Sequence, residues 1–239
     1  MPLSPRIIAI IQARMSSSRL PGKVLRPARG KPMLQYVIER AQNAAEVAGV
    51  VVATSDTAGD DPVAALCGEL GVACHRGPLA DVAARFLGAV RRFGGDAFVR
   101  IGGDSPLIDP ALIDRGVRLF RDQRPDLATN VFPRSYPAGQ SVEVVDANVF
   151  GRVYDKLSHA GEREHVTLHF YNHPDGYRIV NFKSETDFGS LRLSVDTAED
   201  FAVFERLVEA MAAPQWGYGL GALVSLLDRA GDPAGTPRA

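Results

Sequence analysis

Short apolar runs alternate with segments of helical periodicity in the first half of the chain, and this alternation constrains the fold most strongly. Brief apolar runs predict buried strands, whereas apolar residues that recur every three or four positions predict helices. Such alternation predicts an α/β fold, in which a mainly parallel sheet carries helices on both faces. The predicted strands are 7–11, 50–53, 72–75 and 97–101, and the predicted helices start near Pro32, Pro62, Asp81 and Pro110.

The pattern changes after Asp126. The predicted elements there are strands at 141–146 and 177–182, helices at 148–157 and 162–171, a strand that ends at Asp196, and a helix over 197–211. No repeat or clear linker interrupts the chain, so we expect one domain over 1–230. The Pro/Gly-rich residues 231–239 are expected to form a disordered tail.

Charge and hydropathy exclude several function classes. The 27 Lys and Arg residues are balanced by 28 Asp and Glu residues. The chain therefore lacks the basic excess that would indicate a nucleic-acid partner. No apolar stretch approaches the length of a membrane span. The first residues lack the apolar core of a signal peptide, and we therefore expect a cytoplasmic protein without a membrane partner.

A basic segment, QARMSSSRLPGKVL (residues 12–25), directly follows the first predicted strand. In open parallel sheets, ligands bind beyond the carboxyl ends of the strands. Arg14, Arg19 and Lys23 suit phosphate oxygens, and so do serine hydroxyls and backbone N–H groups. A solvated basic loop with a turn at residues 21–22 would also explain the composition. The segment matches neither the P-loop nor the Rossmann glycine motif.

Two aspartates are candidate metal ligands. Asp104 follows the fourth predicted strand and two glycines, whereas Asp196 precedes Thr197, which with Asp200 resembles a helix-capping pair. Carboxylates at one sheet edge can hold Mg²⁺ against phosphate oxygens. A turn or cap role would also explain an aspartate before Ser-Pro, as at Asp104. The metal role is favoured, because Gly102 and Gly103 let another group approach the backbone closely.

Five stretches in one order resemble the SpsF-type cytidylyltransferases, relatives of the CMP-sialic-acid and CMP-KDO synthetases. They are IIAIIQARMSSSRLPGKVL, VVATSD, VRIGGDSPLIDP, GEREHVT and LSVDTAEDF, between about residues 7 and 211. The resemblance implies a three-layer α/β/α nucleotide-diphospho-sugar transferase fold, which is GT-A-like and Rossmann-like, with a mixed, mainly parallel sheet. Family members often carry Gly where Ser16 or Ser17 stands and R-I-T-G-D-C-P at residues 100–106, departures that bear on base selectivity.

The resemblance further implies a Mg²⁺-dependent transfer of CMP from CTP to a sugar acid, such as a nonulosonic acid or KDO, with release of pyrophosphate. The product would serve surface polysaccharide or glycoconjugate synthesis, and the enzyme would be a homodimer, with about 132–185 elaborated for sugar binding and dimerisation. Arg14, Lys23 and Asp104 are the implied catalytic residues, and Asp104 and Asp196 the implied metal ligands. The implied nucleotide-binding residues are Gln12, Arg14, Ser17, Arg19, Lys23, Arg76 and Asp104.

The sugar side is indicated more weakly. Candidate sugar contacts are Asn130, Arg134, Tyr136, Glu143 and Arg163, the last within the stretch 162–165. Arginine suits the carboxylate of a sugar acid, although a charged helix start with a solvated Arg163 explains that stretch equally well. His165 and His169 have helical spacing, but a zinc site would need at least one further ligand.

Three other functions compete with this interpretation. Nucleotidyltransferases that use a sugar 1-phosphate resemble G-x-G-T-R-L openings, and the serines of this loop argue against them. A glycosyltransferase of the same fold would show a D-x-D motif, whereas residues 102–104 are Gly-Gly-Asp. A non-catalytic nucleotide-binding module predicts the loss of Arg14, Lys23, Asp104 or Asp196, and all four are present.

Overall fold

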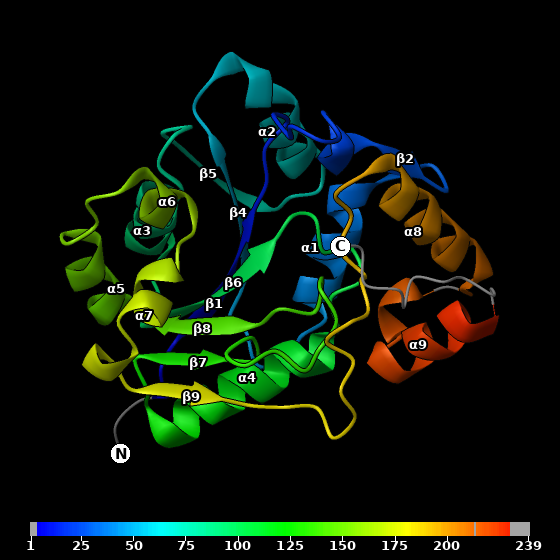
Figure 1. Cartoon of the computed structure of the whole chain (residues 1–239). Coiled ribbons are helices and arrows are strands. Elements are labelled where there is room, and N and C mark those ends of the chain that lie inside the picture. Colours follow the sequence, from blue (N-terminus) through cyan, green and yellow to red (C-terminus); the bar gives the residue numbers. More distant parts are fainter. Residues whose placement is uncertain (1–3, 213, 230–239) are drawn as a thin grey trace.

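The computed structural model describes residues 4–212 and 214–229. Within them a seven-stranded sheet has the order β5-β4-β1-β6-β8-β7-β9, and a two-stranded ribbon, β2 (Pro27–Ala28) with β3 (Lys31–Pro32), lies apart (Figure 1). The strands of the large sheet are β1 (Ile7–Gln12), β4 (Val50–Ser55), β5 (Ala73–Gly77), β6 (Ala97–Gly102), β7 (Leu127–Thr129), β8 (Glu143–Asp146) and β9 (Ile179–Asn181).

The sheet is mixed and mainly parallel, as predicted. β1 lies between β4 and β6, and both pairings are parallel, with Ile11 opposite Val52 on one side and Ile101 on the other. β5 continues the parallel half beside β4. β8 runs antiparallel to both β6 and β7, and β7 pairs with β9 in parallel. The carboxyl ends of β1, β4 and β6 therefore meet at one edge of the sheet.

Helices cover both faces of the sheet, which confirms the three-layer α/β/α fold. One face carries α1 (Met33–Gln42), α2 (Asp61–Glu69), α4 (Pro110–Gln123), α8 (Ala198–Ala210) and α9 (Leu220–Arg229), and the other carries α3 (Val82–Phe93), α5 (Ala147–Tyr154), α6 (Ala160–Glu164) and α7 (Leu168–Asn172). The 3-10 turns are η1 (Lys23–Leu25), η2 (Ala58–Asp60), η3 (Pro174–Gly176) and η4 (Gln215–Gly217).

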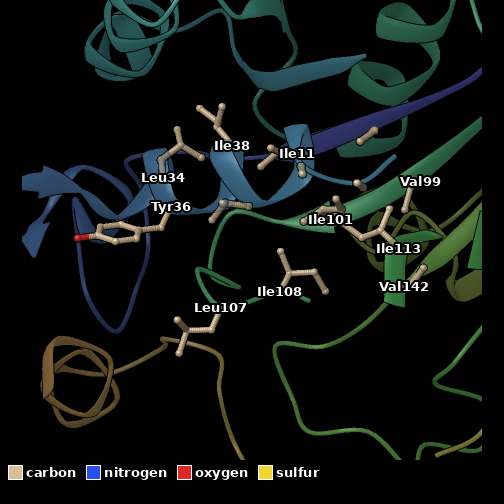
Figure 2. Close-up of a cluster of buried hydrophobic side chains, with 14 of the residues drawn as sticks. Ile11, Leu34, Tyr36, Ile38, Val99, Ile101, Leu107, Ile108, Ile113 and Val142 are labelled. Atoms are coloured by element: carbon tan, nitrogen blue, oxygen red, sulfur yellow. The ribbon is translucent and has the colours of Figure 1, made fainter. Parts of the chain in front are cut away.

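The apolar run of β1 supplies both cores. Ile7, Ala9 and Ile11 belong to the core beneath α1 and α4, whereas Ile8 and Ile10 belong to the core beneath α3 and α5. This division follows from the two-residue period of a strand, and all five residues are at most 1% exposed. Figure 2 shows part of the first core, where side chains from α1 and α4 lie near side chains of β1 and β6. The loop after β1 thus starts from a strand that is packed on both faces.

Polar side chains cap several of the helices. Carboxylates of Asp81 and Asp109 accept hydrogen bonds from backbone N–H groups in the first turns of α3 and α4. Thr197 and Asp200 form a reciprocal capping box at the start of α8. The helix α2 starts at Asp61, one residue before the predicted start at Pro62, and its N-cap is Asp60.

Two predicted elements are wrong. The helix over 162–171 is divided into α6 and α7, because His165 leaves helical geometry at φ −105° and ψ 82°. The strand ending at Asp196 is absent, since residues 191–195 make only an isolated bridge at Arg192 among the described residues. Leu193 and Val195 are nevertheless buried there, and so their alternating pattern resembles that of a strand.

β7 and α9 were not predicted, and the predicted tail at 231–239 lies outside the described residues. Over 4–212 and 214–229, no helix has the length and hydropathy that crossing a bilayer requires.

Candidate active site

A cavity of about 320 Å³ lies at the carboxyl ends of β1 and β6, the position expected for ligands in such sheets. Its walls come from the loop after β1, the loop after β6, the start of α3, the end of α6 and the residue before the α8 cap. Most of the predicted nucleotide and metal residues line it: Gln12, Arg14, Ser17, Arg19, Lys23, Asp104 and Asp196. Segments far apart in the sequence thus meet at one polar cavity.

The loop after β1 is anchored by Asp60, which sequence reasoning did not identify. The Asp60 carboxylate accepts hydrogen bonds from the backbone N–H of Met15 at 2.7 Å and of Ser55 at 3.1 Å, and Asp60 is 2% exposed. Burial raises the pKa of Asp60, but these hydrogen bonds outweigh it and the net pKa is lowered. One carboxylate thereby joins the loop to the end of β4.

The turn into η1 requires Gly22, whose φ is +73°. This turn delivers Lys23 inward, so that the residue is only 8% exposed. Gly103 has a different requirement, because a Cβ there would lie 2.7 Å from the Gln12 carbonyl oxygen. The backbone that Gly103 allows to approach is therefore that of β1.

Lys23 lies between the two predicted metal ligands. Its Nζ is 3.1 Å from Oδ1 of Asp196 and 3.8 Å from Oδ2 of Asp104, and it donates to the Val195 carbonyl oxygen at 2.7 Å. A backbone hydrogen bond of 2.8 Å from the Val195 N–H to the Asp104 carbonyl oxygen fixes the two loops together. The Lys23 ammonium group thus lies within 4 Å of both the Asp104 and the Asp196 carboxylate.

Asp196 is held by its neighbours rather than by a strand. Its backbone N–H donates to Asp200 Oδ2 at 2.9 Å, so the capping residue of α8 also positions Asp196. Its carboxylate pairs with Arg19 at 2.9 Å and with Arg192 at 3.1 Å, in addition to Lys23. The carboxylate is therefore compensated by three cations.

Arg14 is paired as well. Its guanidinium forms a bidentate salt bridge with Glu164 at the end of α6, with N–O distances of 2.7 and 3.3 Å. Both side chains are about one-third exposed, at 36% and 34%. Glu164 and the next residue, His165, line the cavity, and both belong to the charged stretch that the sequence placed on the sugar side.

A buried polar network lies beside the cavity. Arg100 on β6 lines the cavity and pairs with Glu143, its partner across the β6–β8 register, at 2.5 Å. Thr167 and Tyr171 each donate to Glu143 Oε1 at 2.6 Å. Burial raises the pKa of Glu143, but Arg100 and these hydroxyls outweigh it, so the net pKa is lowered. Burial and the Glu143 charge raise the pKa of Tyr171.

Arg85 on α3 is a cavity residue that sequence reasoning missed. It is 2% exposed, and its Nη1 donates to the carbonyl oxygens of Pro78 and Leu79 at 2.7 and 2.9 Å. Its Nε is buried without a hydrogen-bond partner among the described residues. Burial lowers the pKa of Arg85, and the Arg14 charge acts in the same direction. The signal was an arginine at position 85 within the inward-facing stripe of 82, 86 and 89.

Several predicted site residues do not line the cavity. Asn130 is fully buried, and its side chain hydrogen-bonds the backbone of Gln140 and Val142. Tyr136 is 3% exposed and accepts a hydrogen bond from Arg115. These two side chains stabilise the 130–142 loop and do not face the cavity.

The predicted arginines outside the cavity have local partners. Arg76 donates to the carbonyl oxygens of Ser55 and Thr57 and pairs with Asp61. Arg163 pairs with Asp81 at 2.6 Å. Arg134 lines a separate shallow surface depression with Asp187, Gly189 and Ser190. Glu143 reaches the cavity only through Arg100.

The donor set around Lys23 fits a magnesium ion. Mg²⁺ is usually held by one or two carboxylates together with substrate phosphates. Asp104 and Asp196 offer two carboxylates, and the side chain of Asp104 is 40% exposed toward the cavity. The ammonium group near both carboxylates shows that this space already stabilises a cation.

Comparisons with known proteins found similar sequences and a similar structure. A family model described as cytidylyltransferase matches residues 8–215. The spore coat polysaccharide biosynthesis protein SpsF of Bacillus subtilis (strain 168) is 33% identical over 235 residues, which cover 95% of this chain and 96% of that protein. The 3-deoxy-manno-octulosonate cytidylyltransferase of Geobacter metallireducens is 43% identical over 117 residues, 47% of this chain and 43% of that protein. A cytidylyltransferase structure from Leptospira borgpetersenii has a TM-score of 0.90 at 26% identity and covers 98% of both chains.

Proposed function

Since the chain belongs to the cytidylyltransferase family, we propose that it transfers CMP from CTP to a sugar acid of the nonulosonic-acid or KDO type and releases pyrophosphate. The observation that carries the proposal is the convergence of Arg14, Arg19 and Lys23 with Asp104 and Asp196 in one cavity. These groups match a triphosphate and the divalent cation that accompanies it. The Geobacter relative, by its name, acts on a 3-deoxy-octulosonate.

The reaction needs positioning and charge compensation more than covalent catalysis. A hydroxyl oxygen of the sugar forms a bond to the α-phosphorus of CTP, and the bond from that phosphorus to the bridging oxygen breaks. The bonding electrons and the developing negative charge go to pyrophosphate, and the hydroxyl proton is released. Lys23, Arg14 and Arg19 bind the phosphate oxygens and so stabilise the leaving group.

We propose Mg²⁺ as the cofactor, held by Asp104 and Asp196. When bound, the ion polarises the α-phosphate and neutralises phosphate charge. Arg14 and His165 line the cavity from the basic loop and from the residue after α6, so the sugar acid is expected to bind near these two segments. A homodimer acting in the cytoplasm completes the proposal, and light scattering of the purified protein tests the dimer.

Pyrophosphate release tests the function directly. CTP, UTP, GTP and ATP should each be combined with nonulosonic acids, KDO and sugar 1-phosphates in the presence of Mg²⁺. We expect release with CTP and a sugar acid alone. Release with a sugar 1-phosphate would support a sugar-1-phosphate nucleotidyltransferase instead. No release, with CTP bound, would favour a glycosyltransferase or another transferase.

Replacing Lys23 by Ala is expected to raise the KM for CTP by about 10- to 100-fold, because a charge-assisted contact to phosphate is lost. Steady-state rates at saturating sugar acid, measured against CTP concentration, provide the check. Lys31→Ala is the matched control, since Lys31 pairs with Glu39 away from the cavity. An unchanged KM in Lys23→Ala would contradict the triphosphate contact.

Replacing Glu164 by Gln is expected to tighten CTP binding about threefold to fivefold. Glu164 neutralises Arg14 in a pair that is one-third exposed, and such pairs contribute up to about 1 kcal/mol. Calorimetric titration with CTP without sugar acid measures the effect. Glu39→Gln makes the same change of charge in the distant Lys31 pair. Weaker CTP binding would instead mean that Glu164 orients Arg14 toward the ligand.

A further inference from the structure

A second cluster of metal-binding side chains lies outside the cavity, between α6 and α7. Glu162, His169 and His173 each offer one ligand atom, and these three atoms lie within 4.8 Å of one another. The sequence had pointed to His165 with His169, but the chain leaves helical geometry at His165, which lines the active-site cavity. The structure therefore pairs His169 with a different histidine.

The helical spacing of α7 explains the histidine pair. His173 caps the helix four residues after His169, so both imidazoles project from the same side. Their ring centroids are 4.5 Å apart, and Tyr177 packs edge-on against His169 at 5.9 Å. Packing on one side holds His169 in place, whereas His173 is exposed and leaves the cluster open to solvent.

The carboxylate comes from the neighbouring helix and is buried. Glu162 is 7% exposed and His169 is 8% exposed, and Glu162 Oε1 lies 2.9 Å from His169 Nδ1. This buried carboxylate and the two imidazoles together present one oxygen and two nitrogen donors, a combination that a divalent cation can bind.

We propose that Glu162, His169 and His173 bind one divalent transition-metal ion of the zinc type, at a site distinct from the Asp104–Asp196 pair. Two imidazoles and a carboxylate form a ligand set used for zinc, with a fourth position left to water. Ligand distances of about 2.0–2.1 Å place tetrahedral ligand atoms about 3.3 Å apart. The Glu162–His169 separation thus needs to open by only a few tenths of an ångström.

The alternative is a plain Glu162–His169 ion pair beside an unrelated surface histidine. The two differ in the role of His173, because the ion pair does not use it. His173 is exposed, so its replacement leaves the fold intact. His159 is the matched control, since it is also exposed and its charge reaches Glu162, yet it is not among the three clustered residues.

Zinc binding to the full-length protein tests the proposal. Titration is done in millimolar Mg²⁺, so that the Asp104–Asp196 carboxylates do not contribute. We expect one equivalent bound by the wild type and by His159→Ala, and an affinity at least about tenfold weaker in His173→Ala and Glu162→Gln. Zinc should also raise the melting temperature of the wild type more than that of His173→Ala.

Cobalt provides a readout that does not depend on stability. Co²⁺ at a four-coordinate site with nitrogen and oxygen ligands gives visible d–d absorption, and we expect it in the wild type and His159→Ala but not in His173→Ala. Equal zinc affinity in His159→Ala and His173→Ala would overturn the proposal. So would wild-type protein that binds no zinc in the micromolar range.

Discussion

Replacing Asp104 by Asn is expected to lower kcat roughly 1,000-fold, which corresponds to about 4 kcal/mol of transition-state stabilisation. The asparagine keeps the shape of the side chain but loses the charge that we propose holds, with Asp196, a divalent cation against the phosphates. Initial rates of pyrophosphate release at saturating CTP and sugar acid, over a range of Mg²⁺ concentrations, measure this loss.

The same substitution should leave stability nearly unchanged. The Asp104 side chain is 40% exposed, and its contacts within the chain are a 3.2 Å hydrogen bond from Ser105 and the 3.8 Å approach of Lys23. We expect the free energy of unfolding to change by less than about 1 kcal/mol. Asp56→Asn is the matched control, because Asp56 is exposed just beyond β4 at the same sheet edge. Full activity in Asp104→Asn would refute the metal role.

Replacing Glu143 by Ala is expected to destabilise the fold by about 3 kcal/mol. The change leaves Arg100 without its partner at a position where that side chain is 20% exposed, and it removes the acceptor used by Thr167 and Tyr171. Losing one member of a buried pair costs about 3–5 kcal/mol, and the partial exposure of Arg100 places the effect at the lower end. The expected fall in melting temperature is roughly 6–12 °C for a chain of this size.

The destabilisation should depend on pH. The folded-state pKa of Glu143 is lowered from its ordinary value of 4.5, so its contribution is complete above that value and is lost as pH falls through the folded-state pKa. Chemical denaturation at pH 7 and at acidic pH should therefore show a smaller difference between wild type and variant in acid. Glu39→Ala, in the partly buried Lys31 pair, should cost less than about 1 kcal/mol. An equal cost in both variants would contradict the network.

The convergence of the basic loop and the two aspartates on one cavity could be predicted because its signals are local in sequence. An apolar run that ends in a basic segment marks both a buried strand and the loop at its carboxyl end, as β1 and Lys23 show. Asp104 was identified in the same way, directly after β6. Asp196 was expected to lie at the end of a strand. It lies at the cavity without that strand, because Asp200 of the α8 capping box accepts a hydrogen bond from its backbone N–H.

The positions of the candidate sugar contacts could not be predicted, because they depend on pairings between distant segments. Asn130 and Tyr136 lie in a Pro/Gly-rich stretch whose polarity is typical of a ligand loop. Their burial follows from how the chain folds back to form β8 beside β6, which no local pattern indicates. Single charges inside apolar stripes, at Arg85 and Arg100, were a usable signal that the sequence interpretation did not exploit.

The pairing of cations with carboxylates in the cavity has a consequence for the encounter with substrate. Arg14, Arg19, Lys23, Arg85 and Arg100 line it together with Asp104, Glu164 and Asp196, so five positive charges leave a net charge of about +2. Beyond a Debye length of about 8 Å at physiological ionic strength, little of that field persists. Association with CTP should therefore depend weakly on salt, and other cellular polyanions, RNA among them, should compete poorly for a site in which Arg14, Arg19 and Lys23 are already paired with carboxylates.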